Sequence, residues 1–466
     1  MLVAEDTRGT GPEGVAPLLE GEQSKDATIR RVAARGLARL QYYPPAPPAP
    51  RPNRSAERPA AEPCARVVRR VHDANPRVLL AAIDSLAYCT EDGTARIDTL
   101  RAIAGSLEND VPRAFGQVTW HAPAHALVAL ARVSGGASRV DRALVDDFLH
   151  HPRPEVRAYA IRAAVLFKFA DIPGNSMKDP DPNVEAEAIT AMVRLKIFNY
   201  GAFSEALASP AYQVVLAAAN ALARSDYPPT VPALYAAMDR LSAERRENSR
   251  DERIAILTRI AELGSPGDSA RITPYLADFD TTVAAKTAVI LTKWTGRPVA
   301  AHAQPLSIIP GPLADIFYTR GLQLLITMAP SSGGGTIVID LFTDETPATI
   351  ARIVGLANRH YYDGLTFHRV VPNFVIQGGS PGANEQVGDA RFMRDELSGH
   401  SHLRGTVGIS TRGHDTGDAQ FFVNLVDNTR LDHDYTVFGK VVSGMNVVDQ
   451  ILEGDVMERV EVVRRW

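Results

Sequence analysis

Cysteine is scarce in this chain, since Cys64 and Cys89 are the two present among 466 residues. Two cysteines cannot build a disulfide scaffold or a zinc site with four cysteine ligands, so both of these classes are excluded. Their separation also fits no CxxC redox motif. We therefore expect both cysteines to be small, buried or half-buried hydrophobic side chains.

A strong charge of one sign and long hydrophobic runs are also missing. The formal net charge of −4 gives no electrostatic argument for a nucleic-acid partner or an anionic membrane. No apolar run is long enough for a transmembrane helix. Near the N-terminus, Glu5 and Asp6 stand where an export signal would need basic residues. We predict a cytoplasmic protein, the alternative being an exported one whose true start lies upstream.

The composition that is present is that of a globular protein, with 45% hydrophobic and 22% charged residues. A chain of this length favours two or more domains. Residues 1–300 are rich in Ala, Leu, Val and Arg at helical spacing, whereas β-branched runs, glycines and aromatics dominate from about residue 320. We predict a helical domain at 1–300, a linker at 301–320 and a strand-rich domain at 321–466.

One sequence motif, which we call the recurring phrase, repeats in the helical part: a turn with Asp, Asn or Pro is followed by an apolar residue and an Ala-rich helix. Val156, Val184 and Val214 occupy equivalent positions, 28 and 30 residues apart. Further copies lie at residues 26–37, 75–86 and 280–283. Pro and Asp suit the first turn of a helix, where free N–H groups and the helix dipole favour them. A period of about 30 residues predicts stacked helix pairs.

This phrase resembles HEAT or HEAT-like repeats over roughly residues 15–300, and a non-repetitive helical bundle is the alternative. The resemblance implies an all-α solenoid whose concave surface binds protein clients or a partner, which the sequence does not identify. A Pro-rich segment at about 44–63 interrupts the repeats. Such a segment favours extended polyproline II, so we interpret it as an insertion between helices, with a docking motif as the alternative.

The strand-rich part opens with two expected strands, at 324–328 and 333–341. Thr346 and Pro347 then begin an expected helix, with Thr346 as its cap and with Ile350, Ile353, Val354 and Leu356 directed toward a core. Residues 362–379 follow and read YDGLTFHRVVPNFVIQGG.

This last segment carries the signature of the cyclophilin family. The family's other motifs follow in order, at 394–396, 405–410, 419–423, 431–432 and 435–439, before a final helix at 445–451. The resemblance spans about residues 334–460. It implies a closed antiparallel β-barrel with capping helices and the activity of a peptidyl-prolyl cis–trans isomerase, or rotamase.

The chemistry implied by this resemblance needs no metal, nucleotide or redox cofactor. An X–Pro peptide bond has a rotation barrier of about 18–20 kcal/mol, while its two isomers differ by about 0.5–1 kcal/mol. Rotation breaks the amide conjugation. A catalyst therefore needs a pocket that holds the proline ring and a hydrogen-bond donor that favours the twisted amide over the planar one.

By the same resemblance, Arg369 supplies that donor and Gln377 steadies Arg369 and contacts the substrate backbone. The implied proline pocket consists of Phe374, Val375, Phe422, Leu431 and Tyr435. The groove for the residues that precede proline is lined by Ser410, Thr411 and Gln420. We interpret His368 as structural, and His433 as a turn residue and not a metal ligand.

The chain departs from the family pattern at several positions. Arg430 and Tyr435 stand where many members have Trp and His, Ser380 replaces the usual Asp, and Ser410-Thr411 replaces Ala-Asn. These departures leave Arg369, Gln377 and Phe422 in place. They bear on substrate range and cyclosporin affinity more than on activity.

We therefore predict an isomerase that acts on X–Pro bonds of unfolded or partly folded proteins, a chaperone-like role in protein folding. The solenoid would hold clients or dock the enzyme to an assembly. Two alternatives differ in class: a scaffold that binds proline-containing segments with little turnover, and a solenoid adaptor with a decayed C-terminal domain. The presence of both Arg369 and Gln377 favours the enzyme.

Overall fold

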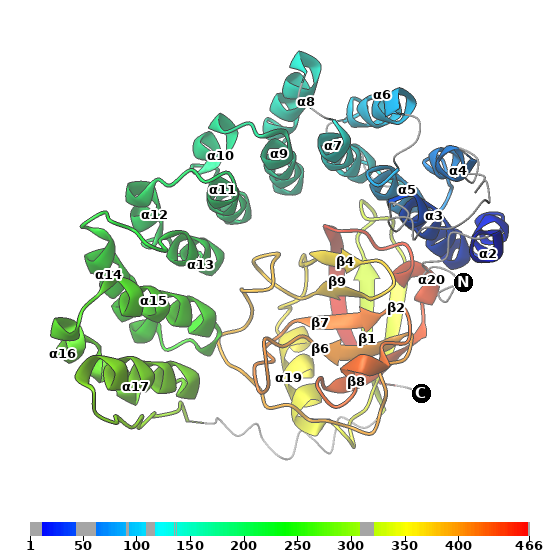
Figure 1. Ribbon diagram of the computed structural model, residues 1–466. Coiled ribbons are helices and arrows are strands. Elements are labelled where there is room, and N and C mark those ends of the chain that lie inside the picture. The colour runs from blue at the N-terminus through cyan, green and yellow to red at the C-terminus, as the bar shows by residue number, and fades with distance from the viewer. Residues whose placement is uncertain are drawn as a thin grey trace, which may run out of the picture. The chain divides into compact units, whose positions relative to one another are not determined.

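The computed structural model describes residues 12–42, 62–89, 93–108, 117–134, 136, 138–307 and 321–464 (Figure 1). Most of the predicted Pro-rich insertion and the second half of the predicted linker lie outside these residues. The chain forms two compact units, Met1–Ile172 with Pro330–Gly333, and Pro173–Ala329 with Gly334–Trp466. The second unit combines helical residues with the strand-rich domain, and the boundary at 301–320 stays a prediction.

Helices alone make up the described elements of the first unit, apart from its short segment at 330–333. Helices α3, α5, α7 and α9 pack one against the next, and the remaining helices pack beside them. Their bounds are α2 Pro12–Glu22, α3 Ala27–Tyr42, α4 Glu62–Arg70, α5 Pro76–Leu86, α6 Gly93–Ala104, α7 His121–Val133, α8 Arg139–Leu149 and α9 Pro154–Phe167.

The helical part of the second unit repeats this arrangement. Helices α11, α13, α15 and α17 pack in sequence order around a second hydrophobic core. The bounds are α10 Asp171–Ser176, α11 Pro182–Arg194, α12 Tyr200–Ala206, α13 Tyr212–Ala221, α14 Thr230–Glu244, α15 Arg250–Leu263, α16 Ser269–Ile272 and α17 Thr281–Thr295. Short 3₁₀ helices lie at Glu247–Ser249, Pro266–Asp268 and Thr273–Ala277.

The recurring phrase marks where the stacked helices begin. Asn75, Asp181 and Asp280 are N-caps whose side chains accept hydrogen bonds from the backbone amides two and three residues later. The apolar residue that follows each cap is fully buried. The predicted all-α stack of helix pairs is therefore confirmed, while its assignment to HEAT repeats stays a prediction. No helix within the described ranges is long and apolar enough to cross a membrane.

Cys89 is buried in the core of the first unit, as expected, with 1% of its surface exposed. It is disulfide-bonded, however, and is not a free thiol. Two cysteines are too few for a scaffold but enough for one cross-link. The Cys64 side chain lies outside the described residues.

The strand-rich domain is a nearly closed antiparallel barrel. Nine strands pair in the order β3-β9-β1-β2-β8-β6-β7-β5-β4. An isolated bridge between Thr366 and Ser380 links the edge strand β3 to the segment that directly follows β5. The strands are β1 Leu322–Met328, β2 Thr336–Leu341, β3 Thr366–Phe367, β4 Arg369–Val371, β5 Val375–Gly378, β6 Thr406–Ile409, β7 Phe421–Asn424, β8 Val437–Ser443 and β9 Asp455–Arg464.

Among the described residues of this domain, two α-helices accompany the barrel, α19 Pro347–Asn358 and α20 Met445–Val448. Ile350, Ile353 and Leu356 of α19 are buried in the barrel core, as predicted. Helix α20 is shorter than the predicted 445–451. The fold class predicted from the sequence, a helical solenoid followed by a barrel with capping helices, is confirmed.

The start of α19 corrects one expectation. The Thr346 side chain makes no capping hydrogen bond, because its hydroxyl donates to the carbonyl of Phe342 at 3.1 Å. Glu396, from a distant loop, accepts hydrogen bonds from the amides of Ala348 and Thr349 at 3.0 and 2.7 Å. A carboxylate at this end also complements the helix dipole. The cap is therefore a tertiary contact that fastens the 394–396 loop to α19.

Replacing Glu396 with Ala should destabilise the strand-rich domain by about 1 kcal/mol, the usual cost of a lost N-cap. Urea unfolding followed by circular dichroism measures the difference. Glu458→Ala removes an exposed carboxylate from β9 and serves as the matched control. Equal stability of the two variants would contradict the capping role.

Candidate active site

Strand register aligns the two residues predicted to be catalytic. Arg369 on β4 lies directly opposite Gln377 on β5, and Gln377 lies opposite Phe422 on β7. Phe422 in turn lies opposite Gly408 on β6. Side chains of directly opposed residues project from the same face of a sheet. The pairing therefore places a guanidinium, an amide and a phenyl ring in one row across the barrel surface.

A hydrogen-bonded chain fixes the orientation of this row. Gln377 is buried, and its Nε2 donates to Ser410 Oγ at 2.9 Å and to Gln420 Oε1 at 3.0 Å. Its Oε1 is left to accept from Arg369 Nη1 at 3.3 Å. The predicted pair is thus brought into contact, and both Ser410 and Gln420 belong to the same network.

The aromatic residues of the predicted proline pocket also meet. The rings of Phe422 and Tyr435 lie 5.9 Å apart in an edge-to-face arrangement. Glycine is required at position 408, because a Cβ there would approach the tip of the Phe422 ring to 2.6 Å. Val375 precedes Gln377 by two residues on β5 and so projects to the same side. Leu431 closes a short 3₁₀ helix, Thr429–Leu431, and is half-buried.

Sequence reasoning missed His402, which supports this pocket from behind. The imidazole is fully buried and stacks on Phe422 at 5.6 Å. Its Nδ1 lies 3.2 Å from Asn424 Nδ2, a donor, so Nε2 carries the proton and donates to the carbonyl of Tyr435 at 3.3 Å. Burial lowers the pKa of His402, which keeps the ring neutral. No motif surrounds this histidine, so only the fold could reveal it.

Three charged residues gather at the edge of the predicted pocket, a group that the sequence did not indicate. The guanidinium of Arg430 lies 4.7 Å from the centre of the Phe374 ring, and that of Arg369 lies 5.9 Å from it. Glu385 Oε1 lies 3.4 Å from Arg369 Nε, with half of the Glu385 side chain exposed. An exposed pair of this kind is weak. Arg369 therefore stays available to a substrate.

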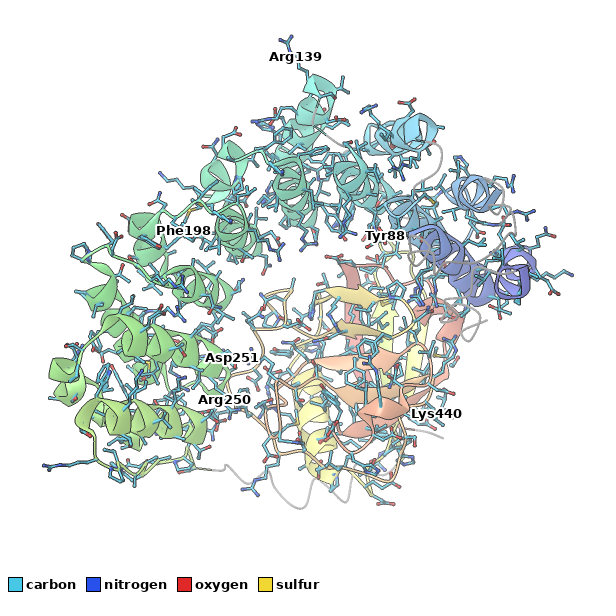
Figure 2. All side chains as sticks on the ribbon, viewed as in Figure 1. Tyr88, Arg139, Phe198, Arg250, Asp251 and Lys440 are labelled. Carbon is cyan, nitrogen blue, oxygen red and sulfur yellow. The ribbon has the colours of Figure 1, made fainter. Side chains whose placement is uncertain are left out.

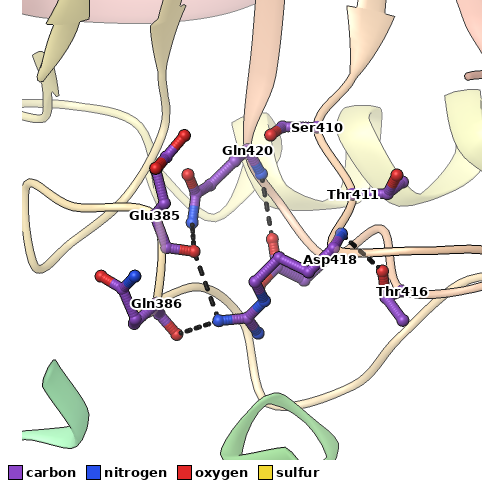
Figure 3. A pocket seen from close by; sticks show the side chains of 8 residues that line it. Glu385, Gln386, Ser410, Thr411, Thr416, Asp418 and Gln420 are labelled. Atoms are coloured by element: carbon purple, nitrogen blue, oxygen red, sulfur yellow. Dashed lines mark hydrogen bonds between the residues drawn. The ribbon is translucent and has the colours of Figure 1, made fainter. Parts of the chain in front are cut away.

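A pocket adjoins this row (Figure 3). It contains the three predicted groove residues, Ser410, Thr411 and Gln420, together with residues that were not predicted. The full lining consists of Glu385, Gln386, Ser410, Thr411, Arg412, Thr416, Asp418 and Gln420. Burial raises the pKa of Asp418, whose Oδ1 accepts hydrogen bonds from the amides of Ala419 and Gln420.

The remaining predictions concern residues outside this row. His433 is exposed in a turn with a left-handed φ of 67°. Among the residues that the structure describes, no three His, Cys, Asp or Glu side chains gather as a metal site. Ser380 is buried, and its hydroxyl donates to the carbonyl of Val387 at 2.5 Å.

Comparison with known proteins identifies the family. The sequence profile described as "Cyclophilin type peptidyl-prolyl cis-trans isomerase/CLD" matches residues 325–465. Peptidyl-prolyl cis-trans isomerase B of Bacillus subtilis is 40% identical over 131 residues, which cover 28% of this chain and 92% of that protein. This chain belongs to the cyclophilin-type peptidyl-prolyl cis–trans isomerases.

Other relatives match the same domain of this cyclophilin. A peptidyl-prolyl cis-trans isomerase of Helicobacter pylori is 39% identical over 130 residues, covering 27% of this chain and 80% of its own. A solved cyclophilin type isomerase of Cryptosporidium parvum, in the presence of the dipeptide Ala-Pro, matches with 20% identity and a TM-score of 0.28. That match covers 31% of this chain and 99% of the other.

His368 lies beside Arg369 in this cyclophilin, and neither of its ring nitrogens has a hydrogen-bond partner within the described residues. Burial, and secondarily the charge of Arg369, lowers the pKa of His368 from 6.5 to about 4. A neutral imidazole whose ring nitrogens are both buried fits the structural role predicted for it.

The depressed pKa predicts acid-sensitive stability. Between pH 6.5 and about 4 the unfolded chain binds a proton at His368 that the folded domain does not, so stability falls as pH falls through this window. The loss should approach about 3 kcal/mol. Chemical unfolding at a series of pH values measures it. His368→Phe should flatten this part of the profile, and an unchanged slope would refute the assignment.

Proposed function

We propose that this cyclophilin isomerises X–Pro bonds in unfolded or partly folded proteins, with Arg369 and Gln377 as its catalytic residues. The observation that carries the proposal is the hydrogen bond from Arg369 to Gln377 beside the Phe422 pocket. It supports a fixed donor next to the aromatic side chains of Phe422 and Tyr435.

In this proposal the proline ring enters between Phe374, Phe422 and Tyr435. The substrate amide then twists and loses its conjugation, so that the lone pair becomes localised on the proline nitrogen. Arg369 donates a hydrogen bond to this nitrogen. Gln377 holds the guanidinium at the pocket edge through its Oε1. No proton is transferred, which agrees with the lowered pKa values of His368 and His402.

Arg369→Ala should lower kcat/KM for X–Pro peptides by about a hundredfold to a thousandfold, the cost of one transition-state donor of about 2.7–4 kcal/mol. Peptide binding should weaken far less, because the aromatic pocket remains. Arg369→Lys should restore little, since an ammonium lacks the planar fork of donors. A protease-coupled assay measures turnover, and isothermal titration measures binding.

Arg459→Ala is a matched control, because Arg459 is exposed on β9 and pairs there with Glu461. Its turnover should equal that of the wild type. If Arg369→Ala also kept full turnover, the alternative of a proline-segment-binding scaffold would be the better description of the site.

We further propose that the helical stack recruits unfolded clients or a protein partner. The stacked helix pairs support this role, since repeat arrays present extended surfaces to proteins. The isomerase site itself consists of residues of the second unit. Capture of a client by the helices would raise its local concentration at that site.

A chain that lacks residues 1–172 tests recruitment, because it removes the first unit and keeps the second. Its turnover of short peptides should match that of the full chain. Its acceleration of a proline-limited refolding reaction should fall about tenfold at low enzyme concentration, because local concentration is lost. Circular dichroism checks that the shortened chain folds. Equal acceleration of refolding by both chains would argue against client capture by the first unit.

A further inference from the structure

Residues 382–392 form a loop of the isomerase domain that contacts the helical residues of the same unit; we refer to it as the docking loop. Asn183 Nδ2 on α11 donates to the carbonyl of Gly382 at 2.9 Å, and Asn384 Nδ2 donates to Asn183 Oδ1 at 2.9 Å. Asn248 is fully buried and donates to the carbonyl of Gly388 at 3.1 Å. Val387 of the loop also packs against the hydrophobic core of the helices.

Glu247 fastens the far end of the docking loop. Its backbone amide donates to the carbonyl of Ala390 at 2.8 Å, and its carboxylate accepts from the Phe392 amide at 2.8 Å. The same carboxylate pairs with Arg391 Nε at 3.0 Å. Charge-assisted hydrogen bonds of this kind are about twice as strong as neutral ones. The helices therefore hold the loop along its length.

The other side of the docking loop lines the isomerase site. Gln420 Nε2 donates to the carbonyls of Glu385 and Val387 at 3.3 and 3.1 Å. A Cβ at Gly388 would lie 1.8 Å from a carboxylate oxygen of Asp418, so this residue has no room for a side chain. The loop thus touches the groove network and the helices at once.

Arg412 makes the same connection with one side chain. Its Nη1 donates to the carbonyls of Glu385 and Gln386 at 3.3 and 3.0 Å, and Arg412 is itself one of the residues that line the pocket. Its Nη2 donates to the carbonyl of Asn248 at 3.3 Å, and its Nε lies 3.2 Å from Asp251 Oδ2. Asp251 lies in the first turn of α15, where Figure 2 labels it beside Arg250.

The charge of Arg412 is balanced mainly by Asp251. The neighbouring Glu252 is fully buried, and burial raises its pKa to about 8, so it is largely neutral at pH 7. Asp251 is the carboxylate that forms an ion pair with Arg412. Removal of the Asp251 charge would therefore leave the pocket more positive.

We propose that Asp251, together with Glu247 and Asn248, positions the docking loop and Arg412 and thereby sets the charge preference of the groove for residues that precede proline. The helical residues 173–307 are then a part of the isomerase site and determine its specificity. This inference rests on the proposed function, because it concerns substrates of the same site.

The test uses the full chain with Asp251→Asn and three peptides whose residue before the X–Pro pair is Ala, Glu or Lys. The ratio of kcat/KM for the Glu peptide to that for the Lys peptide should rise about threefold to tenfold, through KM, while kcat stays near the wild-type value. Asp251→Glu keeps the charge and should restore the original ratio. A ratio within a factor of about 1.5 of the wild type would overturn the proposal.

Glu244→Gln is the matched control, since Glu244 pairs with Arg240 on α14. It should leave the ratio unchanged. Hydrogen exchange gives a second reading that does not depend on turnover: Glu247→Gln should speed exchange at the Phe392 amide, which donates to that carboxylate. Unchanged exchange would show that the loop is not held by the helices. If the wild-type chain itself showed no turnover of these peptides, that result would instead count against the proposed function.

Discussion

The register of β4, β5 and β7 is the constraint on which the site depends. It places Arg369, Gln377 and Phe422 opposite one another in successive strands. A slip of one residue in any of these pairings would turn one of the three side chains to the other face of the sheet. Gly408 on β6 completes this constraint, because the Phe422 ring occupies the space where a side chain would stand.

The centre of the site is polar, but the buried side chains that form it are neutral. Gln377 and Gln420 are buried amides that bond to each other, and His402 is a buried imidazole kept neutral. Arg369 is a permanent cation that contacts this network through Gln377. A fixed donor in partly desolvated surroundings acts more strongly than the same donor in water, which is what stabilisation of a twisted amide requires.

The helical residues 173–307 have two roles in this structure. Their stacked helices bury a core of their own, as repeats do. Their edge around Glu247, Asn248 and Asp251 also supplies polar groups that the docking loop and Arg412 satisfy. Because buried polar groups are costly without partners, the loop and these helices stabilise each other.

Local features could be predicted from the amino-acid sequence: the helix starts at Asn75, Asp181 and Asp280, the main strands of the barrel, and the identity of the residues in the cyclophilin signature. These follow from short-range capping chemistry and from a motif that is contiguous in the chain. Three long-range contacts could not be predicted in this way: Glu396 and not Thr346 caps α19, His402 stacks on Phe422, and Arg412 pairs with Asp251. Those partners are far apart in the sequence and carry no periodicity, so the folding of the chain alone brings them together.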